Sequence, residues 1–141
     1  MTIEEEEARL IRRFNALDDW MARYDYLMLE GLRLPELEES SRTDENRIWG
    51  CEAKVWLKIC WKEGRAFLSG YSPSLIVRGL VAVMIHLASG RTCEELAGWQ
   101  MAFFEATGLD RELGEERKRG TEAMLSRIKE QAEEMKAKEN L

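Results

Sequence analysis

Three cysteines and a single histidine are the residues of this chain best suited to covalent chemistry. A cysteine thiolate can act as a nucleophile, exchange with a sulfur–sulfur bond or bind a metal. Cys51, Cys60 and Cys93 form no CxxC pair, and their odd number argues against a disulfide framework. A four-ligand zinc site would need all three cysteines with His86 or a carboxylate, and the usual close spacing is missing. We therefore expect no metal site.

Cys51 has the neighbours that best suit a reactive thiol. Gly50 precedes it and permits a tight turn, and Arg47 and Lys54 are near enough in sequence to stabilise a thiolate. A predicted short strand over 46–49 would present Cys51 at a loop tip, where reactive groups are often held. The alternative is a small, buried apolar residue at a strand end. Local features leave both interpretations open.

The sequence gives less reason to expect a reactive thiol at the other two cysteines. Cys93 follows Thr92, a predicted N-cap, and a helix N-terminus can lower the pKa of a thiol. A buried or incidental role is nevertheless the expected one. Cys60 alternates with Lys58 and Lys62 along a predicted strand, where partial exposure is expected but no neighbouring base is implied.

Several common active-site motifs are absent from the sequence. There is no glycine-rich phosphate loop and no GxSxG nucleophile motif. His86 lies within an apolar helical segment, which favours a structural or surface role. Carboxylates cluster in runs such as Glu4 to Glu7, and these runs are expected to be solvated surface rather than acid–base pairs.

Composition and charge narrow the class of protein. The chain has 141 residues, 45% of them hydrophobic and 34% charged, which fits one globular domain over residues 1–141. Its net charge of −6 argues against nucleic-acid binding. The N-terminus is acidic where a secretory signal would be basic, and no apolar run is long enough to span a bilayer. We expect no membrane association and a cytoplasmic location.

Apolar periodicity and capping residues predict the helices. Thr2 and Glu5 have the spacing of a capping box that begins the first helix, and Thr92 and Glu95 have the same spacing further on. A second helix is predicted from Asp18 to Gly31, with a buried face that includes Met21. Further helices are predicted over 74–89, 102–107 and 115–138. The charged segment 132–141 is expected to fray.

Alternating apolar residues predict the sheet. Strands are expected over 55–62 and 66–71, joined by a turn at 62–65, and a short strand over 46–49 is expected to join them. A polar stretch over 34–47 is predicted to be a surface loop. The expected fold class is α+β, a two-layer domain in which a three-stranded antiparallel sheet packs against helices.

The stretch ENRIWGCEAKVWL, residues 45–57, resembles the signature of the SufE/CsdE family of sulfur-acceptor proteins. In that family a Gly-Cys pair is followed by a polar triplet and then by Val-Trp and an aliphatic residue, as in this chain. Further resemblance lies, in order, over 13–31, 76–96, 103–109 and 116–129. The chain departs from the family at Glu116, Tyr71 and Pro73, so the particular desulfurase and the downstream acceptor stay open.

The resemblance implies a sulfur carrier and not an enzyme. Cys51 would accept persulfide sulfur from a pyridoxal-phosphate-dependent cysteine desulfurase, stimulate that enzyme and pass sulfur to an iron–sulfur scaffold or another acceptor. Gly50, Glu52 and Arg117 would serve loop movement and partner binding. The chain itself would bind no cofactor. Two alternatives are an iron–sulfur scaffold that uses all three cysteines and a non-catalytic interaction domain in which Cys51 is core.

Overall fold

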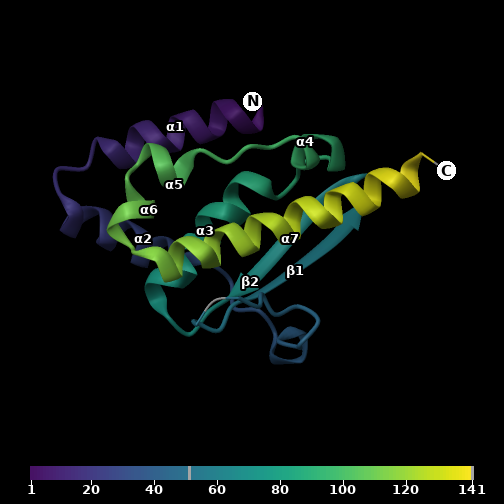
Figure 1. Cartoon of the computed structure of the whole chain (residues 1–141), viewed down its shortest axis with the longest axis horizontal. Helices are drawn as coiled ribbons and strands as arrows, with labels where there is room; N and C mark the ends of the chain where they lie inside the picture. Colours follow the sequence, from purple (N-terminus) through teal and green to yellow (C-terminus); the bar gives the residue numbers. More distant parts are fainter. Residues whose placement is uncertain (51, 141) are drawn as a thin grey trace.

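A computed structural model shows helices packed on a small sheet (Figure 1). It describes residues 1–50 and 52–140; the predictions for Cys51 concern a residue outside that set. The elements in chain order are α1 (Ile3–Asn15), α2 (Trp20–Arg33), a 3-10 helix η1 (Glu39–Ser41), β1 (Trp56–Lys62), β2 (Arg65–Tyr71), α3 (Leu75–Ala88), α4 (Cys93–Ala97), α5 (Phe103–Ala106), α6 (Leu109–Glu112) and α7 (Glu115–Glu139).

The sheet has two antiparallel strands among the described residues, so the prediction of three strands is wrong. The expected turn does join β1 to β2, with φ of 52° at Glu63 and 77° at Gly64. The segment predicted as a third strand forms only one bridge, Arg47 to Trp56. A turn in which the Arg47 N–H donates to Asp44 O at 3.3 Å precedes this bridge, and Gly50, with φ of 97°, turns the chain soon after it. The bridge is therefore confined to a single pair of residues.

The two faces of the sheet follow the alternation in sequence. Leu57 on β1 and Leu68 on β2 are buried on the inner face, in the same apolar core as α3 and α7. Trp56, Lys58 and Cys60 alternate with those buried positions and lie on the outer face, where Cys60 is exposed. The period-two pattern was therefore sufficient to assign the inner and outer faces.

Helices α2 and α3 cross at two glycines. A Cβ on Gly79 would lie 2.1 Å from Leu27 O, and one on Gly31 would lie 2.9 Å from Gly79 N. Gly31 is thus a packing position inside α2, and the prediction that it ends the helix is wrong. The predicted buried face is also too wide, since Met21 is 75% exposed whereas Leu27 is fully buried.

Helix α1 begins at the predicted capping box and carries an unexpected buried carboxylate. Glu7 is only 4% exposed, so the expectation that the whole run from Glu4 to Glu7 is solvated is wrong. Its Oε2 accepts from the backbone N–H of Ala102 at 2.8 Å and of Phe103 at 3.0 Å, and its Oε1 accepts from Trp99 Nε1 at 3.2 Å. Glu7 therefore anchors the chain that leads into α5 to α1.

Helix α7 confirms the helix predicted over 115–138 to within one residue. It continues to Glu139, with Ala132 fully buried. Near its end, Glu139 Oε2 accepts a hydrogen bond from Cys93 Sγ at 3.3 Å. Fraying of residues 132–141 in solution stays a prediction. No helix in the described part of the chain is both long and apolar enough to cross a membrane.

Glu6 links α1 to α3. Its carboxylate bonds to Arg9 within α1 and, at 2.8 Å, to Nε2 of His86 on α3. Hydrogen bonds from Arg9 and then from His86 lower the pKa of Glu6 from an ordinary 4.5 to about 2. His86 therefore has a structural, half-exposed role, as expected.

The depressed pKa of Glu6 makes folding stability depend on acid. The ionised carboxylate stabilises the fold above pH 4.5, and this contribution is lost as the pH falls from 4.5 towards 2. Because Arg9 and His86 are partly exposed, we expect the loss to be about 1 kcal/mol. Urea unfolding at pH 6 and pH 3 should show this loss of unfolding free energy in the wild type, and Glu6→Gln should lack it. Glu4→Gln, exposed on the same helix, is the control, and an equal loss in Glu6→Gln would contradict the assignment.

Candidate functional site

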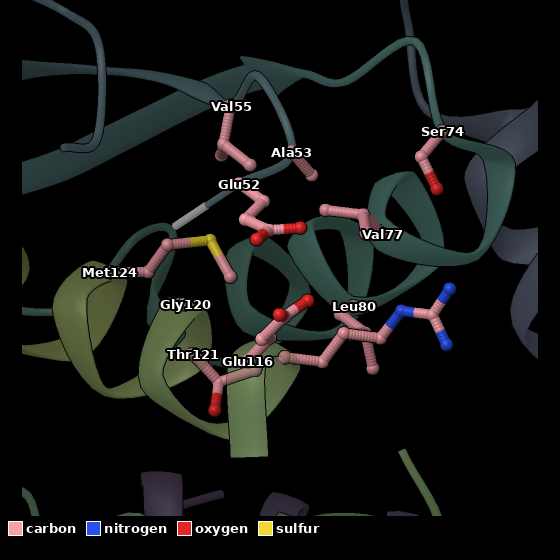
Figure 2. Close-up of a pocket in the computed structure, with 11 residues that line it drawn as sticks. Glu52, Ala53, Val55, Ser74, Val77, Leu80, Glu116, Gly120, Thr121 and Met124 are labelled. Atoms are coloured by element: carbon pink, nitrogen blue, oxygen red, sulfur yellow. The ribbon is translucent and has the colours of Figure 1, made fainter. Parts of the chain in front are cut away.

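A cavity of about 170 Å³ opens between the segment that precedes β1, the first half of α3 and the first half of α7 (Figure 2). Three sections of the chain that are distant in sequence contribute to it. The lining residues are Glu52, Ala53, Val55, Ser74, Val77, Leu80, Glu116, Arg117, Gly120, Thr121 and Met124.

The loop before β1 is held firmly at its base. Ile48 and Val55 are each only 2% exposed, and the Ile48 N–H donates to Val55 O at 2.8 Å. Between them, Gly50 has φ of 97°, a conformation that glycine adopts readily. Apart from the chain neighbours of Gly50, none of the described residues has an atom within 4 Å of a Cβ built on it, so the turn rather than close packing requires glycine there. Gly50 and Glu52, the two neighbours of Cys51 in sequence, are both exposed.

The inner part of the cavity is apolar. Val55, Val77, Leu80 and Met124 are buried and belong to the main core. Figure 2 shows the Met124 thioether approaching from α7 and Val77 and Leu80 from α3. Such a lining excludes water and suits a polarisable atom such as sulfur.

The mouth of the cavity is polar. Glu52 comes from the loop, and Glu116 and Arg117 come from the first turn of α7. Ser74 is the N-cap of α3, yet its hydroxyl makes no capping bond. The Thr121 hydroxyl donates to Lys118 O at 2.8 Å and is therefore already engaged. A small polar group placed at this mouth would therefore lie near the guanidinium of Arg117 and the carboxylates of Glu52 and Glu116.

The structure brings together two of the four residues that the sequence proposed. Glu52 and Arg117 line the same cavity, Gly50 forms the turn beside it, and Cys51 lies outside the described residues. The sequence reasoning missed the cavity positions on α3. Their signal was present as the spacing of Ser74, Val77 and Leu80, but nearly every face of that helix is apolar, so periodicity could not select one.

The two described cysteines do not offer a comparable site. Cys93 is 1% exposed, and burial, followed by its bond to Glu139, raises the pKa of its thiol. Burial and the bond to Glu139 therefore outweigh any lowering of the Cys93 pKa by the N-terminus of α4. Cys60 is exposed on the outer face of β1. Across residues 1–50 and 52–140, no three His, Cys, Asp or Glu side chains converge in a way that could hold a metal.

Comparison with known proteins gives one family. A family model described as "SufE: Fe-S metabolism associated domain" matches residues 8–132. An uncharacterized SufE-like protein of Rhizobium etli is 38% identical over 130 residues, covering 88% of this chain and 87% of the relative. One from Rhizobium meliloti is 37% identical over 131 residues, covering 89% of this chain and 93% of the relative.

The fold also has a solved counterpart. The solution structure of a hypothetical protein from Thermus thermophilus matches with a TM-score of 0.73 and 19% identity. The match covers 91% of this chain and 93% of that one. At this level of identity the likeness concerns the fold alone.

Proposed function

Because the chain belongs to the SufE family of Fe-S metabolism associated domains, we propose that it carries sulfur as a persulfide on Cys51. The donor is a pyridoxal-phosphate-dependent cysteine desulfurase, and the chain stimulates that enzyme by removing its bound sulfur. The sulfur then passes to an iron–sulfur scaffold or another acceptor. The chain acts as an accessory protein in the cytoplasm and holds no cofactor of its own.

The cavity beside the Gly50 turn is the observation that best supports this proposal. Its apolar inner wall is sized for a small group, and the loop that contains Cys51 contributes Glu52, Ala53 and Val55 to it. A persulfide exposed to water is open to reductants and oxidants. A loop that can alternate between this cavity and solvent would protect the sulfur between transfers, and Gly50 gives the backbone freedom for that movement.

The transfer is a thiol exchange. The Cys51 thiolate attacks the terminal sulfur of the donor's cysteine persulfide, forming a new S–S bond. The donor's own S–S bond breaks, and its cysteine leaves as a thiolate that takes up a proton. Cys51 then holds Cys–S–S⁻, and no external oxidant or reductant is needed. A second exchange of the same kind delivers the terminal sulfur to the acceptor and restores the Cys51 thiolate.

The cavity residues have separate roles in this scheme. The Arg117 guanidinium stabilises negative charge on a thiolate or persulfide at the mouth, or contacts the partner. Glu52 lies on the loop itself and contributes to partner recognition. The buried side chains of Val77, Leu80 and Met124 exclude water from the sulfur.

An iron–sulfur scaffold is the less well supported alternative. It would require the thiolates of Cys60 and Cys93 as ligands in addition to Cys51. Cys93 is buried, donates to Glu139 and has a raised pKa, and all three features oppose a metal-binding thiolate. A non-catalytic interaction domain would have no use for an apolar cavity with a polar mouth at this loop.

Mass measurement of sulfur transfer tests the proposal. The purified chain is mixed with a cysteine desulfurase from the same cell and cysteine, and its intact mass is taken without reductant. We expect a gain of roughly 32 Da per transferred sulfur, reversed by reductant, since the product is a persulfide. Cys51→Ser should abolish the gain, whereas Cys60→Ser, which removes the exposed thiol on β1, should preserve it. Sulfur on Cys51→Ser, or none on the wild type with any desulfurase of that cell, would contradict the proposal.

A further inference from the structure

Six arginine and aromatic side chains form a continuous stack at the end of the sheet nearest the Gly50 turn. We call this stack the arginine–aromatic ladder; its members are Arg42, Arg47, Trp49, Trp56, Tyr71 and Arg78. Trp56 and Tyr71 are register partners at the end of the hairpin, with ring centroids 6.5 Å apart. Trp56 is also the bridge partner of Arg47, so the segment before the turn is joined directly to the strand pair.

Arginines cover the aromatic rings throughout the ladder. The Cζ atoms of Arg42 and Arg78 lie 3.9 Å and 4.7 Å from the centroid of the Tyr71 ring. Arg47 Cζ lies 4.4 Å from the Trp49 ring and 5.9 Å from the Trp56 ring. Cation–π contacts at these distances hold each guanidinium plane in place. The arginine head groups are therefore oriented before any partner arrives.

The charges of the ladder are not paired with carboxylates of the described residues. Among residues 1–50 and 52–140, the ion pairs to carboxylates do not include Arg42, Arg47 or Arg78. Arg42 uses its Nε on Leu37 O, and Arg78 bonds to Ser72 O and the Tyr71 hydroxyl. Arg47 has no side-chain hydrogen bond in the described structure, and its buried Nε is left without an acceptor. Several guanidinium donors thus stay available on a chain whose net charge is −6.

The composition and place of the ladder match a protein-binding surface. Tryptophan, tyrosine and arginine are the residue types that dominate binding energy at protein interfaces. Trp49 is 56% exposed, although it is a large apolar side chain. Arg47 and Trp49 directly precede Gly50, so a macromolecule that reaches Cys51 must come close to them.

We propose that the arginine–aromatic ladder is the surface on which the cysteine desulfurase docks, through a carboxylate-bearing patch of that enzyme. This rests on the proposed function, because it names the surface that brings the donor to Cys51. A forked guanidinium edge binds a carboxylate in bidentate fashion, and carboxylates are the anionic groups that a protein surface offers. The exposed Trp49 ring adds apolar area at the end of the ladder nearest Gly50. A second copy of this chain is a poorer occupant, since it shares the same negative net charge.

The experiment measures the affinity of the desulfurase for three forms of the full chain. The test variant is Arg42→Gln/Arg47→Gln. The control is Arg12→Gln/Arg13→Gln, which removes the same amount of charge from the exposed end of α1, on the side of the molecule opposite the 34–50 segment (Figure 1). We expect the test variant to raise Kd about tenfold or more and to flatten its dependence on salt. The control should bind as the wild type does.

A second readout separates docking from chemistry. At saturating concentration the Arg42→Gln/Arg47→Gln variant should still take one sulfur onto Cys51, because the thiol is intact. Trp49→Ala, which removes an exposed ring and leaves the charges, should weaken binding without changing the salt dependence. These two results together would assign the ladder to docking.

The proposal has clear contrary outcomes. An unchanged Kd in the test variant, with normal sulfur transfer, would overturn the ladder as the docking surface and leave Cys51 as the carrier. Failure of the wild type to bind or accept sulfur would remove both proposals. A third outcome is a test variant that binds the desulfurase normally and loses only self-association, or only binding to an iron–sulfur scaffold or to single-stranded RNA. That result would assign the ladder to a different partner and would also overturn this proposal.

Discussion

Gly79→Ala is expected to destabilise the fold by about 3 kcal/mol or more, because an added methyl has no room at the α2–α3 crossing. The new Cβ would lie 2.1 Å from Leu27 O and 2.7 Å from Leu27 C, both backbone atoms that cannot rotate away. The two helices must separate to relieve this overlap. Their separation would loosen a contact that buries Leu27 and Leu80. Urea unfolding at neutral pH, monitored by tryptophan fluorescence and circular dichroism, measures the effect.

Gly98→Ala is the matched control for the crossing. Its Cβ would lie 3.6 Å from Glu94 O, an ordinary contact, and its φ of −90° suits any residue. Its stability should therefore change by no more than about 0.5 kcal/mol. If Gly79→Ala were as stable as Gly98→Ala, the close approach of α2 and α3 would be wrong.

The second large effect is expected for Glu7→Ala, which should cost about 3 kcal/mol of stability. Alanine would leave the indole N–H of Trp99 and the backbone N–H groups of Ala102 and Phe103 without their carboxylate acceptor. Trp99 and Phe103 are fully buried, so water cannot readily replace the lost bonds. Thermal or urea unfolding checks the loss, and tryptophan fluorescence should report a change around Trp99.

Two variants define what Glu7 contributes. Glu4→Ala removes an exposed carboxylate from the same helix and should have little effect. Glu7→Gln keeps one carbonyl acceptor and should fall between Glu7→Ala and the wild type. Equal stability of Glu7→Ala and Glu4→Ala would show that the buried acceptor is not needed.

Gly31 and Glu7 illustrate where sequence reasoning was insufficient. Gly31 follows an apolar run and matches a helix-ending residue, but the same absence of a side chain also permits two helices to touch. Only the position of α3 decides between these roles. Glu7 belongs to a run of four consecutive glutamates, and which of them is buried depends on where Trp99 and α5 pack.

The prediction of a third strand was wrong for a similar reason. The segment 46–49 was predicted to be a short strand, and its backbone does bond to Val55 and Leu57. How far that pairing runs depends on the direction in which the chain arrives from the Asp44–Arg47 turn. Such a direction is set by packing and not by propensity.

The sequence by itself determined the family, the α+β class, the capping boxes of α1 and α4, the hairpin and the two faces of its strands. These features depend on local spacing, on capping chemistry and on motifs along the chain, all of which are readable without coordinates. It also singled out Cys51, whose role stays a proposal. The tertiary structure decided the features that depend on residues distant in sequence. It placed Glu52 and Arg117 at one cavity and buried Glu7 against the start of α5. It also brought α2 into contact with α3 at Gly79 and stacked Arg42 and Arg47 on aromatic rings of the hairpin and the loop. Only folding decides which side chains distant in sequence come to share one small volume.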